Sequence, residues 1–310
     1  MKKFLFVILA MILPMNLLCA TDAYVKVTSS NNTVSWVKIK VEYKYNGNEY
    51  KVSSNAIDKN TEGAVDLDNV WSESGGTGKQ YFIIELDYLA FYDCSKITSI
   101  NCSRTSFVSI YGQAFQGCTS LKSVSIPYAQ SLGSSAFAYC SSLTSVTLNR
   151  IYRIDSGAFY YCSALTSFNI GSSVRIIEGN PFQGCTSLTN LTIASSNTYF
   201  TIDNGVIYSK DLTTLQAYLP AKAGTSFYVP ATVTKIGESA FSGNRTLSTV
   251  IMRNGLQTIG SSAFYNTNIQ SVYLPGSITT IGNSAFYYSN KLNSVKTASS
   301  VPITITNNVF

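Results

Sequence analysis

The sequence of 310 residues contains no histidine. Histidine is the commonest general base at neutral pH, a frequent zinc ligand, and the residue that activates many serine and cysteine nucleophiles. Its absence excludes a Ser-His or Cys-His couple and argues against a metal centre built on imidazole. We therefore expect a protein that is not an enzyme and that holds no cofactor.

Charged side chains are also scarce, because only 12% of the residues are Asp, Glu, Lys or Arg. The formal net charge is +6, and it falls to +4 if Lys2 and Lys3 are removed with an N-terminal signal. A charge this small and this dispersed does not predict nucleic-acid binding. The polar surface is expected to consist mainly of Ser, Thr, Asn and Tyr.

A nucleotide-binding loop is missing as well. The stretch Ser74–Gln80 is rich in glycine and contains Gly78 followed by Lys79. A Walker loop needs a glycine five residues before Gly78, where Glu73 stands, and a serine or threonine directly after Lys79, where the chain has glutamine. Because the pattern fails twice, we interpret this stretch as a loop between two structural regions.

Only one long apolar run is present, and it lies at the N-terminus. Residues 1–20 combine two lysines, the apolar stretch Phe4–Leu18 and the small Ala20, which is typical of an export signal. An alternative is a lipoprotein signal, in which Cys19 is lipidated and tethers the protein to a membrane. Leu18 is large for that cleavage, so we favour soluble export. Both alternatives predict a secreted or cell-surface protein.

A repeat dominates the rest of the chain. A phenylalanine that follows a small residue returns at intervals of 22 to 24 residues, with one longer gap of 59 between Phe182 and Phe241. The general frame is I-G-x-x-A-F-x-x-C-x-x-L-x-S-V-x-I-P, as in Ile259–Pro275. Its apolar residues alternate over the S-V-x-I segment, which predicts a short strand with one buried face. Stacked copies of that strand form a parallel sheet with a continuous core.

This frame resembles the BspA-like bacterial leucine-rich repeats over about residues 88–310. The A-F pair, the C-x-x-L step and the I-P exit from the strand carry the resemblance. The resemblance implies a β-rich leucine-rich-repeat solenoid, with a horseshoe-like parallel sheet, in an exported bacterial protein that attaches to host matrix proteins or to other cells. We place the solenoid at residues 81–310.

Two regions depart from the repeat. Residues 21–80 alternate polar and apolar side chains around Asn46-Gly47, which predicts a β-hairpin that caps the first coil. The 59-residue gap contains Asn204-Gly205 between two short apolar runs, which predicts an inserted β-hairpin at about residues 197–222. The recurring glycines are expected at turns that need unusual backbone dihedrals; they are Gly112, Gly133, Gly237, Gly260 and Gly282.

Five cysteines, from Cys94 to Cys185, stand three residues after the repeat phenylalanine. In later coils Asn244, Thr267 and Ser289 take the same place, which favours a small side chain that packs and donates one hydrogen bond to a neighbouring coil. Metal binding is less consistent with this pattern, because ligands must converge on one point rather than form a line. Disulfides between adjacent coils remain an alternative, since neighbouring strands lie about 4.8 Å apart and export meets oxidising conditions.

No acidic pair stands out among the repeats. Asp155, Glu178 and Glu238 occupy similar places, but they lie in different coils. The outward positions of the strands are Ser, Thr and Asn in the early coils, whereas larger side chains appear later. We predict a partner-binding surface in the C-terminal half, because Tyr and Arg are enriched at binding hot spots. Its candidate residues are Ile251, Arg253, Tyr273, Lys296 and, from the insert, Tyr208.

Two functions therefore remain open. The first is a non-enzymatic recognition or adhesion protein that binds a macromolecular partner, such as a host matrix or cell-surface protein, through the repeat surface. The second is a glycan-binding module of a polysaccharide-capture system, which would use tyrosine faces with amide and hydroxyl groups. A membrane partner is expected only if Cys19 is lipidated.

Overall fold

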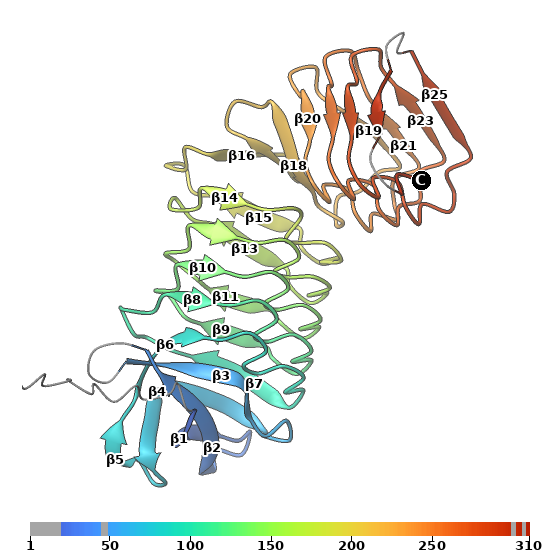
Figure 1. The fold of residues 1–310 in the computed structure, drawn as a ribbon. Coiled ribbons are helices and arrows are strands. Elements are labelled where there is room, and N and C mark those ends of the chain that lie inside the picture. The colour runs from blue at the N-terminus through green and yellow to red at the C-terminus, as the bar shows by residue number, and fades with distance from the viewer. Residues whose placement is uncertain (1–19, 45–48, 299–301, 306–307) are drawn as a thin grey trace, which may run out of the picture.

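A computed structural model describes residues 20–44, 49–298, 302–305 and 308–310 (Figure 1). Most of the export signal, including Cys19, and the predicted turn at Asn46-Gly47 lie outside the described residues. The described residues form strands and turns without a helix. Accordingly, none of them belongs to a helix long and apolar enough to cross a membrane.

The N-terminal cap consists of five strands, in which neighbours pair mainly antiparallel. They are β1 (Thr21–Thr28), β2 (Val34–Tyr43), β3 (Glu49–Ile57), β4 (Gly63–Glu73) and β5 (Thr77–Gln80).

Each coil that follows contributes one strand to each of two parallel walls. The first wall contains the S-V-x-I strands β7 (Ile97–Asn101), β9 (Ser123–Ser125), β11 (Ser145–Thr147), β13 (Ser167–Ile170) and β15 (Asn190–Ile193). The second wall contains β6 (Phe82–Leu86), β8 (Ser109–Ile110), β10 (Ser131–Leu132), β12 (Arg153–Ile154) and β14 (Ile176–Ile177). The second wall was not predicted, because its strands are mostly two residues long.

The cap joins the second wall and the strands β7, β9 and β11 of the first wall into one sheet of 13 strands, while β13 and β15 form a separate sheet. Strand β4 pairs with β7 of the first wall, β3 pairs with β6 of the second, and β1 and β2 lie between them. Apolar residues of the cap, such as Val25 and Leu67, share one buried core with the coils. The expectation of a β-rich solenoid with an N-terminal β cap is therefore confirmed, and the cap covers the end of the core that the first coil would otherwise expose.

The insert forms three strands, β16 (Phe200–Asp203), β17 (Val206–Ser209) and β18 (Thr214–Tyr218). Strands β16 and β17 are the predicted hairpin, and β18 pairs parallel with the next coil. Neighbouring residues face opposite sides of such strands. Ile207 and Ala217 thus lie in the N-terminal core, while Val206 and Tyr218 lie in a second, C-terminal core. The insert is a partition between the two cores, and Figure 1 shows that the stacking direction of the coils changes there.

The C-terminal coils repeat the two-wall arrangement. Their first wall contains β19 (Ser226–Tyr228), β21 (Thr249–Ile251), β23 (Ser271–Leu274) and β25 (Ser294–Thr297). Their second wall contains β20 (Lys235–Ile236), β22 (Thr258–Ile259), β24 (Thr280–Ile281) and β26 (Thr304–Ile305).

A ladder of stacked aromatic rings runs through the core, in the segment of each coil that leads from a second-wall strand to the next first-wall strand. Phe115 and Phe137 are nearly parallel, with ring centroids 5.0 Å apart, and the other neighbours stack at similar distances. At the partition the ladder restarts with Tyr218, whose ring stacks on Phe241 at 5.1 Å. Ala217-Tyr218 therefore replaces the Ala-Phe pair inside the 59-residue gap.

Glycine is required at the recurring positions for a different reason from the predicted one. Gly133, Gly260 and Gly282 do not adopt the left-handed conformation, which falls instead on residues two before the phenylalanine, such as Ser262 (φ 53°). A Cβ atom on Gly260 would lie 2.7 Å from the backbone nitrogen of Glu238 in the previous coil. Glycine is thus required for the close approach of stacked backbones.

Candidate recognition surface

The cysteines pack between coils and do not form a chemical site. The Sγ atoms of Cys140, Cys162 and Cys185 donate to the carbonyl oxygens of the preceding ladder phenylalanines at 3.0–3.1 Å. Burial raises the pKa of the Cys185 thiol to about 12, so the reactive thiolate is disfavoured. All six cysteines of the described chain are free and buried. The described residues also contain no group of three or more His, Cys, Asp or Glu side chains able to hold a metal ion.

The acidic residues of the coil edge are ion-paired. Arg153 binds Asp155 through Nε at 2.6 Å, and it binds Glu178 of the next coil through Nη2, also at 2.6 Å. Burial raises the pKa of Asp155, and the positive charge of Arg153 opposes that shift. Glu238 lies apart from this cluster and is exposed. The arrangement joins two coils and does not resemble a catalytic pair.

The first wall of the N-terminal coils presents a row of small polar side chains. Strand register aligns Asn101 with Ser125 and Ser125 with Thr147. After an interruption, Asn169 aligns with Thr192, whose hydroxyl donates to the Asn169 Oδ1 atom at 2.9 Å. This row carries no charge and no large apolar side chain.

The same row changes character in the C-terminal coils. Tyr228 aligns with Ile251, and Tyr273 aligns with Lys296. The two tyrosines are 58% and 55% exposed, which is high for rings on a regular sheet. The guanidinium carbon of the exposed Arg253 lies 6.0 Å from the centre of the Tyr228 ring. We call Tyr228, Ile251, Arg253, Tyr273 and Lys296 the aromatic row.

Four of the five predicted binding residues therefore belong to one surface, and Tyr228, which the sequence interpretation overlooked, completes it. Tyr208 does not belong to it. The Tyr208 side chain is only 3% exposed, and its pKa is raised to about 12 by burial inside the partition. The prediction that Tyr208 supplies an accessible edge is wrong, because β17 is covered on both faces by the two cores.

A second exposed group of tyrosines lies beside the phenylalanine ladder. Tyr139 stacks on Tyr161 with ring centroids 5.7 Å apart, and Tyr287 contacts Tyr288 at 4.3 Å. All four rings are partly exposed to solvent. We call these four residues the tyrosine edge. The sequence signal for them is the Tyr at the first or second position after the ladder phenylalanine.

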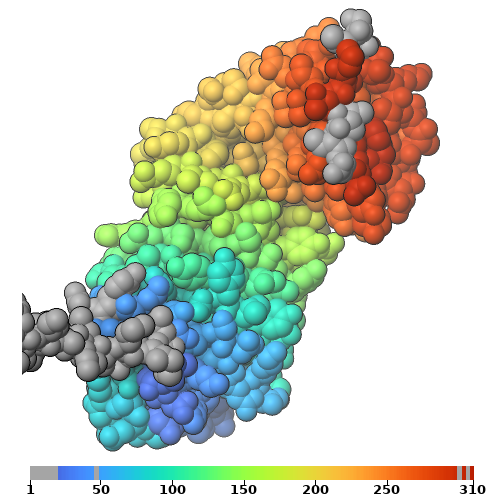
Figure 2. Space-filling view, viewed as in Figure 1, coloured from blue at the N-terminus to red at the C-terminus, as the bar shows by residue number. Residues whose placement is uncertain are grey.

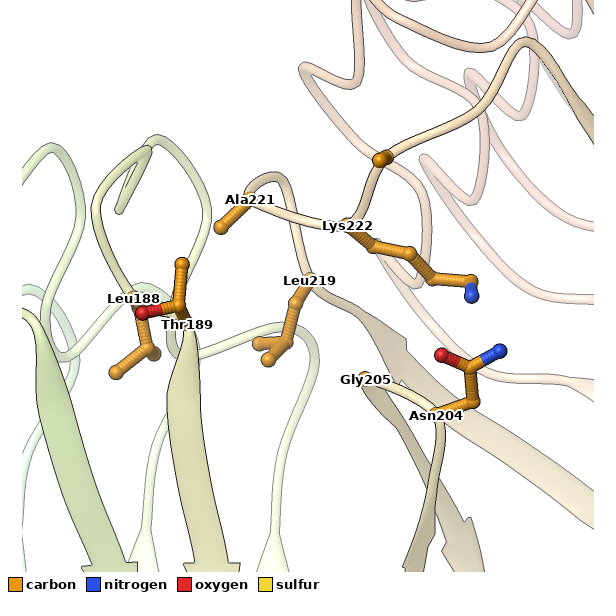
Figure 3. A pocket seen from close by; sticks show the side chains of 8 residues that line it. Leu188, Thr189, Asn204, Gly205, Leu219, Ala221 and Lys222 are labelled. Carbon is orange, nitrogen blue, oxygen red and sulfur yellow. The ribbon is translucent and has the colours of Figure 1, made fainter.

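A shallow pocket of about 320 Å³ lies where the partition meets the N-terminal coils. Figure 3 shows its lining, with Leu188 and Thr189 on one side and the turn at Asn204-Gly205 on the other. The side chains of Lys222 and Asn204 approach each other on the side away from Leu188 and Thr189. In the space-filling view of Figure 2, the yellow insert lies between the green N-terminal coils and the orange C-terminal coils.

Comparison with known proteins agrees with this architecture. The family described as BspA type Leucine rich repeat region matches residues 84–214 and 217–310 in six copies. No curated protein matches the chain. The two matched ranges cover most of the chain and meet at the partition.

Several solved structures are similar in fold. A leucine-rich repeat protein from Eubacterium ventriosum has a TM-score of 0.52 and 21% identity, and the match covers 90% of this chain and 73% of that chain. The pneumococcal vaccine antigen PcpA has a TM-score of 0.54 and 19% identity, with 92% and 82% covered. A leucine-rich repeat protein from Bacteroides ovatus has a TM-score of 0.55 and 20% identity, with 88% and 66% covered.

Proposed function

The chain belongs to the BspA-type leucine-rich repeat family, and we propose that it is an exported, non-enzymatic protein that binds a protein partner through the aromatic row. The main observation in support of this proposal is that Tyr228 and Tyr273 are exposed on a sheet. The equivalent positions of the N-terminal coils carry small polar side chains. Rings held by a sheet lose little conformational freedom on binding, and Tyr and Arg are typical hot-spot residues.

The charges of this surface indicate the kind of partner. Arg253 and Lys296 flank the rings, whereas the ion pairs Arg104–Asp68, Arg153–Asp155 and Arg153–Glu178 lie in the cap and the N-terminal coils. Ile251, on the strand between those of Tyr228 and Tyr273, adds an aliphatic contact. A protein surface that combines acidic and apolar side chains would complement this set, because opposite charges guide association and apolar contacts supply affinity.

Non-enzymatic binding is supported by the chemistry of the interior. The sequence has no histidine, the cysteines of the coils are buried hydrogen-bond donors, and Asp155 is paired with Arg153. Export is supported by the signal-like residues 1–20. Mass spectrometry of the mature N-terminus tests the export proposal: a lipidated Cys19 would replace free secretion by membrane anchoring.

A second candidate function is glycan binding, which the tyrosine edge favours. Tyr139 and Tyr161 are 46% and 39% exposed, and the ring and hydroxyl group of a tyrosine are a combination that suits neutral sugars. This surface lies on the phenylalanine side of the coils and is therefore distinct from the aromatic row. Variants of one surface leave the other intact, which makes the two functions separable.

The test uses the mature chain against a panel of extracellular-matrix proteins and a glycan array. Under our proposal, Tyr228→Ala and Tyr273→Ala each weaken binding to a matrix protein about tenfold or more, as is usual for hot-spot tyrosines. Ser123→Ala and Ser125→Ala, on the corresponding wall of the N-terminal coils, serve as controls and leave binding unchanged. Binding that survives both tyrosine substitutions would move the site away from the aromatic row. Binding to glycans that is lost in Tyr161→Ala would favour the second candidate.

A further inference from the structure

The first wall is interrupted between β11 and β13. The sheet that contains β11 ends there, and β13 pairs only with β15 in a separate sheet of two strands. Most Cα atoms of the two strands lie more than 8 Å apart. Hydrogen-bonded neighbours lie about 4.8 Å apart. The coils stay joined elsewhere, because β12 pairs with β14 and Tyr139 N–H donates to the Tyr160 carbonyl at 2.7 Å.

Backbone hydrogen bonds at the entry to each strand show how local this interruption is. Thr144 N–H donates to the Lys122 carbonyl at 2.9 Å, and Asn190 N–H donates to the Thr166 carbonyl at 3.1 Å. Within the described chain, no corresponding bond joins Thr166 to Thr144. The ladder therefore opens at one coil boundary and closes again at the next.

Phe168 explains the opening. It stands in the S-V-x-I frame where Val124 and Val146 occupy the neighbouring coils. Its ring enters the core and contacts both Phe159 and Phe182, with centroid distances of 5.1 and 5.4 Å. Phe182 belongs to the coil that carries β15, so these contacts hold β13 toward β15. Because a ring is much wider than an isopropyl group, we interpret Phe168 as a wedge that keeps β13 away from β11.

The opening forms a groove on the outer face of the wall. Two adjoining hollows of about 320 and 300 Å³ share Val146, Phe168 and Asn169. Apolar atoms of Val146, Leu148 and Phe168 form part of the lining. The remaining side chains that line it are uncharged and mainly carry hydroxyl or amide groups; they include Thr144, Ser145, Ser167, Asn149, Asn190 and Thr192.

Two strand edges face each other across this groove. In a parallel ladder, successive residues direct their N–H and C=O groups to alternate neighbours. Ser145 N–H donates to Lys122, so the backbone groups of Val146 are directed away from β9 and toward β13. The carbonyl groups of Thr166 and Ile170 accept hydrogen bonds from the β15 side. The backbone N–H and C=O groups of Ser167 and Asn169 are therefore directed toward β11.

We propose that the groove between β11 and β13 binds an extended, uncharged segment of a partner polypeptide by strand addition. An extended backbone offers alternating donors and acceptors that complement both edges. A strand that is hydrogen-bonded on both sides requires a separation of about 9.6 Å between β11 and β13, which is twice the normal spacing of strands. Pairing with one of the two edges is already sufficient for strand addition. The partner's inward side chains contact Val146 and Phe168. The absence of charge among the lining residues matches an uncharged segment.

The experiment uses the mature chain and an acetylated, amidated peptide that copies residues 142–149 (SLTSVTLN), a segment whose strand β11 already pairs parallel with β9 in this solenoid. Binding is measured by calorimetry, and amide hydrogen exchange is followed by NMR. We expect saturable binding that slows exchange of the Ser167 and Asn169 amides about tenfold or more. Exchange in the aromatic row is expected to stay unchanged.

Matched controls distinguish strand addition from nonspecific binding of the peptide. The same peptide with Val146→Pro lacks the central donor and cannot extend a ladder, so it is expected to bind about tenfold more weakly or not at all. In the protein, Asn169→Pro removes a donor that faces the groove at a sheet edge and is expected to weaken binding about fivefold to tenfold. Phe168→Val removes the wedge, allows β13 to approach β11, and is expected to abolish binding.

The buried cysteines of the Asn169→Pro and Phe168→Val proteins should not react with a thiol reagent under native conditions, which verifies that both variants are folded. Equal binding of the proline peptide would overturn the proposal, as would exchange protection confined to other coils. Binding of a neutral oligosaccharide such as maltoheptaose, with no binding of the peptide, would reassign the groove to sugars. None of these outcomes depends on the aromatic row, so the proposed function is tested separately.

Discussion

The Sγ atom of Cys118 lies 3.0 Å from the carbonyl oxygen of Phe91, which belongs to the coil before it. The same donation recurs in the next three coils, and near the C-terminus the Ser289 hydroxyl donates to the Phe264 carbonyl at 2.6 Å. Cysteine and serine thus both act as small donors between coils at this position. Asn244 and Thr267 depart from the pattern, because the Asn244 Nδ2 atom is buried without an acceptor and the Thr267 hydroxyl donates to the Phe264 carbonyl of its own coil. The ladder is a set of interactions between coils, and each of them can be tested singly.

Substitution of Cys140 tests the role of the donor. Cys140→Ser keeps a donor of similar size, whereas Cys140→Ala removes the bond to the Phe115 carbonyl and leaves a small cavity. We expect the alanine variant to lose about 1–2 kcal/mol more free energy of unfolding than the serine variant, measured by urea denaturation. Equal losses would show that the sulfur only fills space.

The buried thiols also predict a dependence of stability on alkaline pH. Burial raises the pKa of Cys94 to about 11 and that of Cys102 to about 12, from an ordinary value of 9.0. Thiols of the unfolded chain ionise above pH 9, while those of the folded chain keep their protons. Their contribution to the free energy of unfolding is complete below pH 9 and is lost as pH rises toward 11–12.

Denaturation at pH 8, 9 and 10 measures this effect. The free energy of unfolding is expected to decline above pH 9, and Cys185→Ser should flatten the decline because one buried thiol is removed. A variant with the same slope as the parent chain would contradict the assignment to thiols. Six cysteines of the coils should react with a thiol reagent only after denaturation.

Position in the aromatic ladder sets the cost of losing a ring. Phe137 is fully buried between Phe115 and Phe159, at centroid distances of 5.0 and 5.5 Å. We expect Phe137→Ala to cost about 3–5 kcal/mol of unfolding free energy. Phe310 stacks on Phe286 alone and is 55% exposed, so Phe310→Ala should cost about 1 kcal/mol or less. Similar losses at both positions would be inconsistent with this ladder.

Asn180 joins the two cores at the partition. It is 2% exposed, donates through Nδ2 to the Ala240 carbonyl at 3.2 Å, and accepts from Phe182 N–H at 3.0 Å. We expect Asn180→Ala to cost about 2–3 kcal/mol, because the buried Phe182 N–H loses its acceptor. Coupling between the two halves should weaken as well, so that their amides exchange independently.

Asn197 supplies the matched control for that experiment. It is equally buried, but its bonds to the Gly171 and Val174 carbonyls stay within the N-terminal core. Asn197→Ala should therefore destabilise the N-terminal half without separating the unfolding of the two halves. If both variants unfold in the same manner, Asn180 does not have a special role in coupling.

The sequence was sufficient to predict the repeat, the parallel S-V-x-I strands and the inserted hairpin, because all of them follow from local patterns of apolar residues. For the cap the sequence predicted a β-hairpin, whereas the structure has five strands. The second wall was missed because two-residue strands such as Arg153–Ile154 carry no detectable alternation. The role of Gly260 was also misjudged, since the approach of a neighbouring backbone depends on stacking and not on local dihedrals.

Departures from the repeat were harder to interpret than the repeat itself. Tyr208 looked accessible because a hairpin insert is usually a surface feature, whereas here the insert separates two cores. Phe168 was visible in the frame as a phenylalanine in place of valine, but its effect on strand pairing requires the positions of Phe159 and Phe182. The sequence located most of the aromatic row, and the register of the strands supplied Tyr228.

The interruption at β11 and β13 also has a mechanical consequence. A pulling force along the stack meets hydrogen bonds throughout the 13-stranded sheet, but it meets none between these two strands of the first wall. The opposite side remains bonded through β12 and β14 and through the stacked rings of Phe137 and Phe159. Under tension the solenoid should therefore bend at this boundary before any coil unfolds, because only one side of the boundary is hydrogen-bonded from strand to strand.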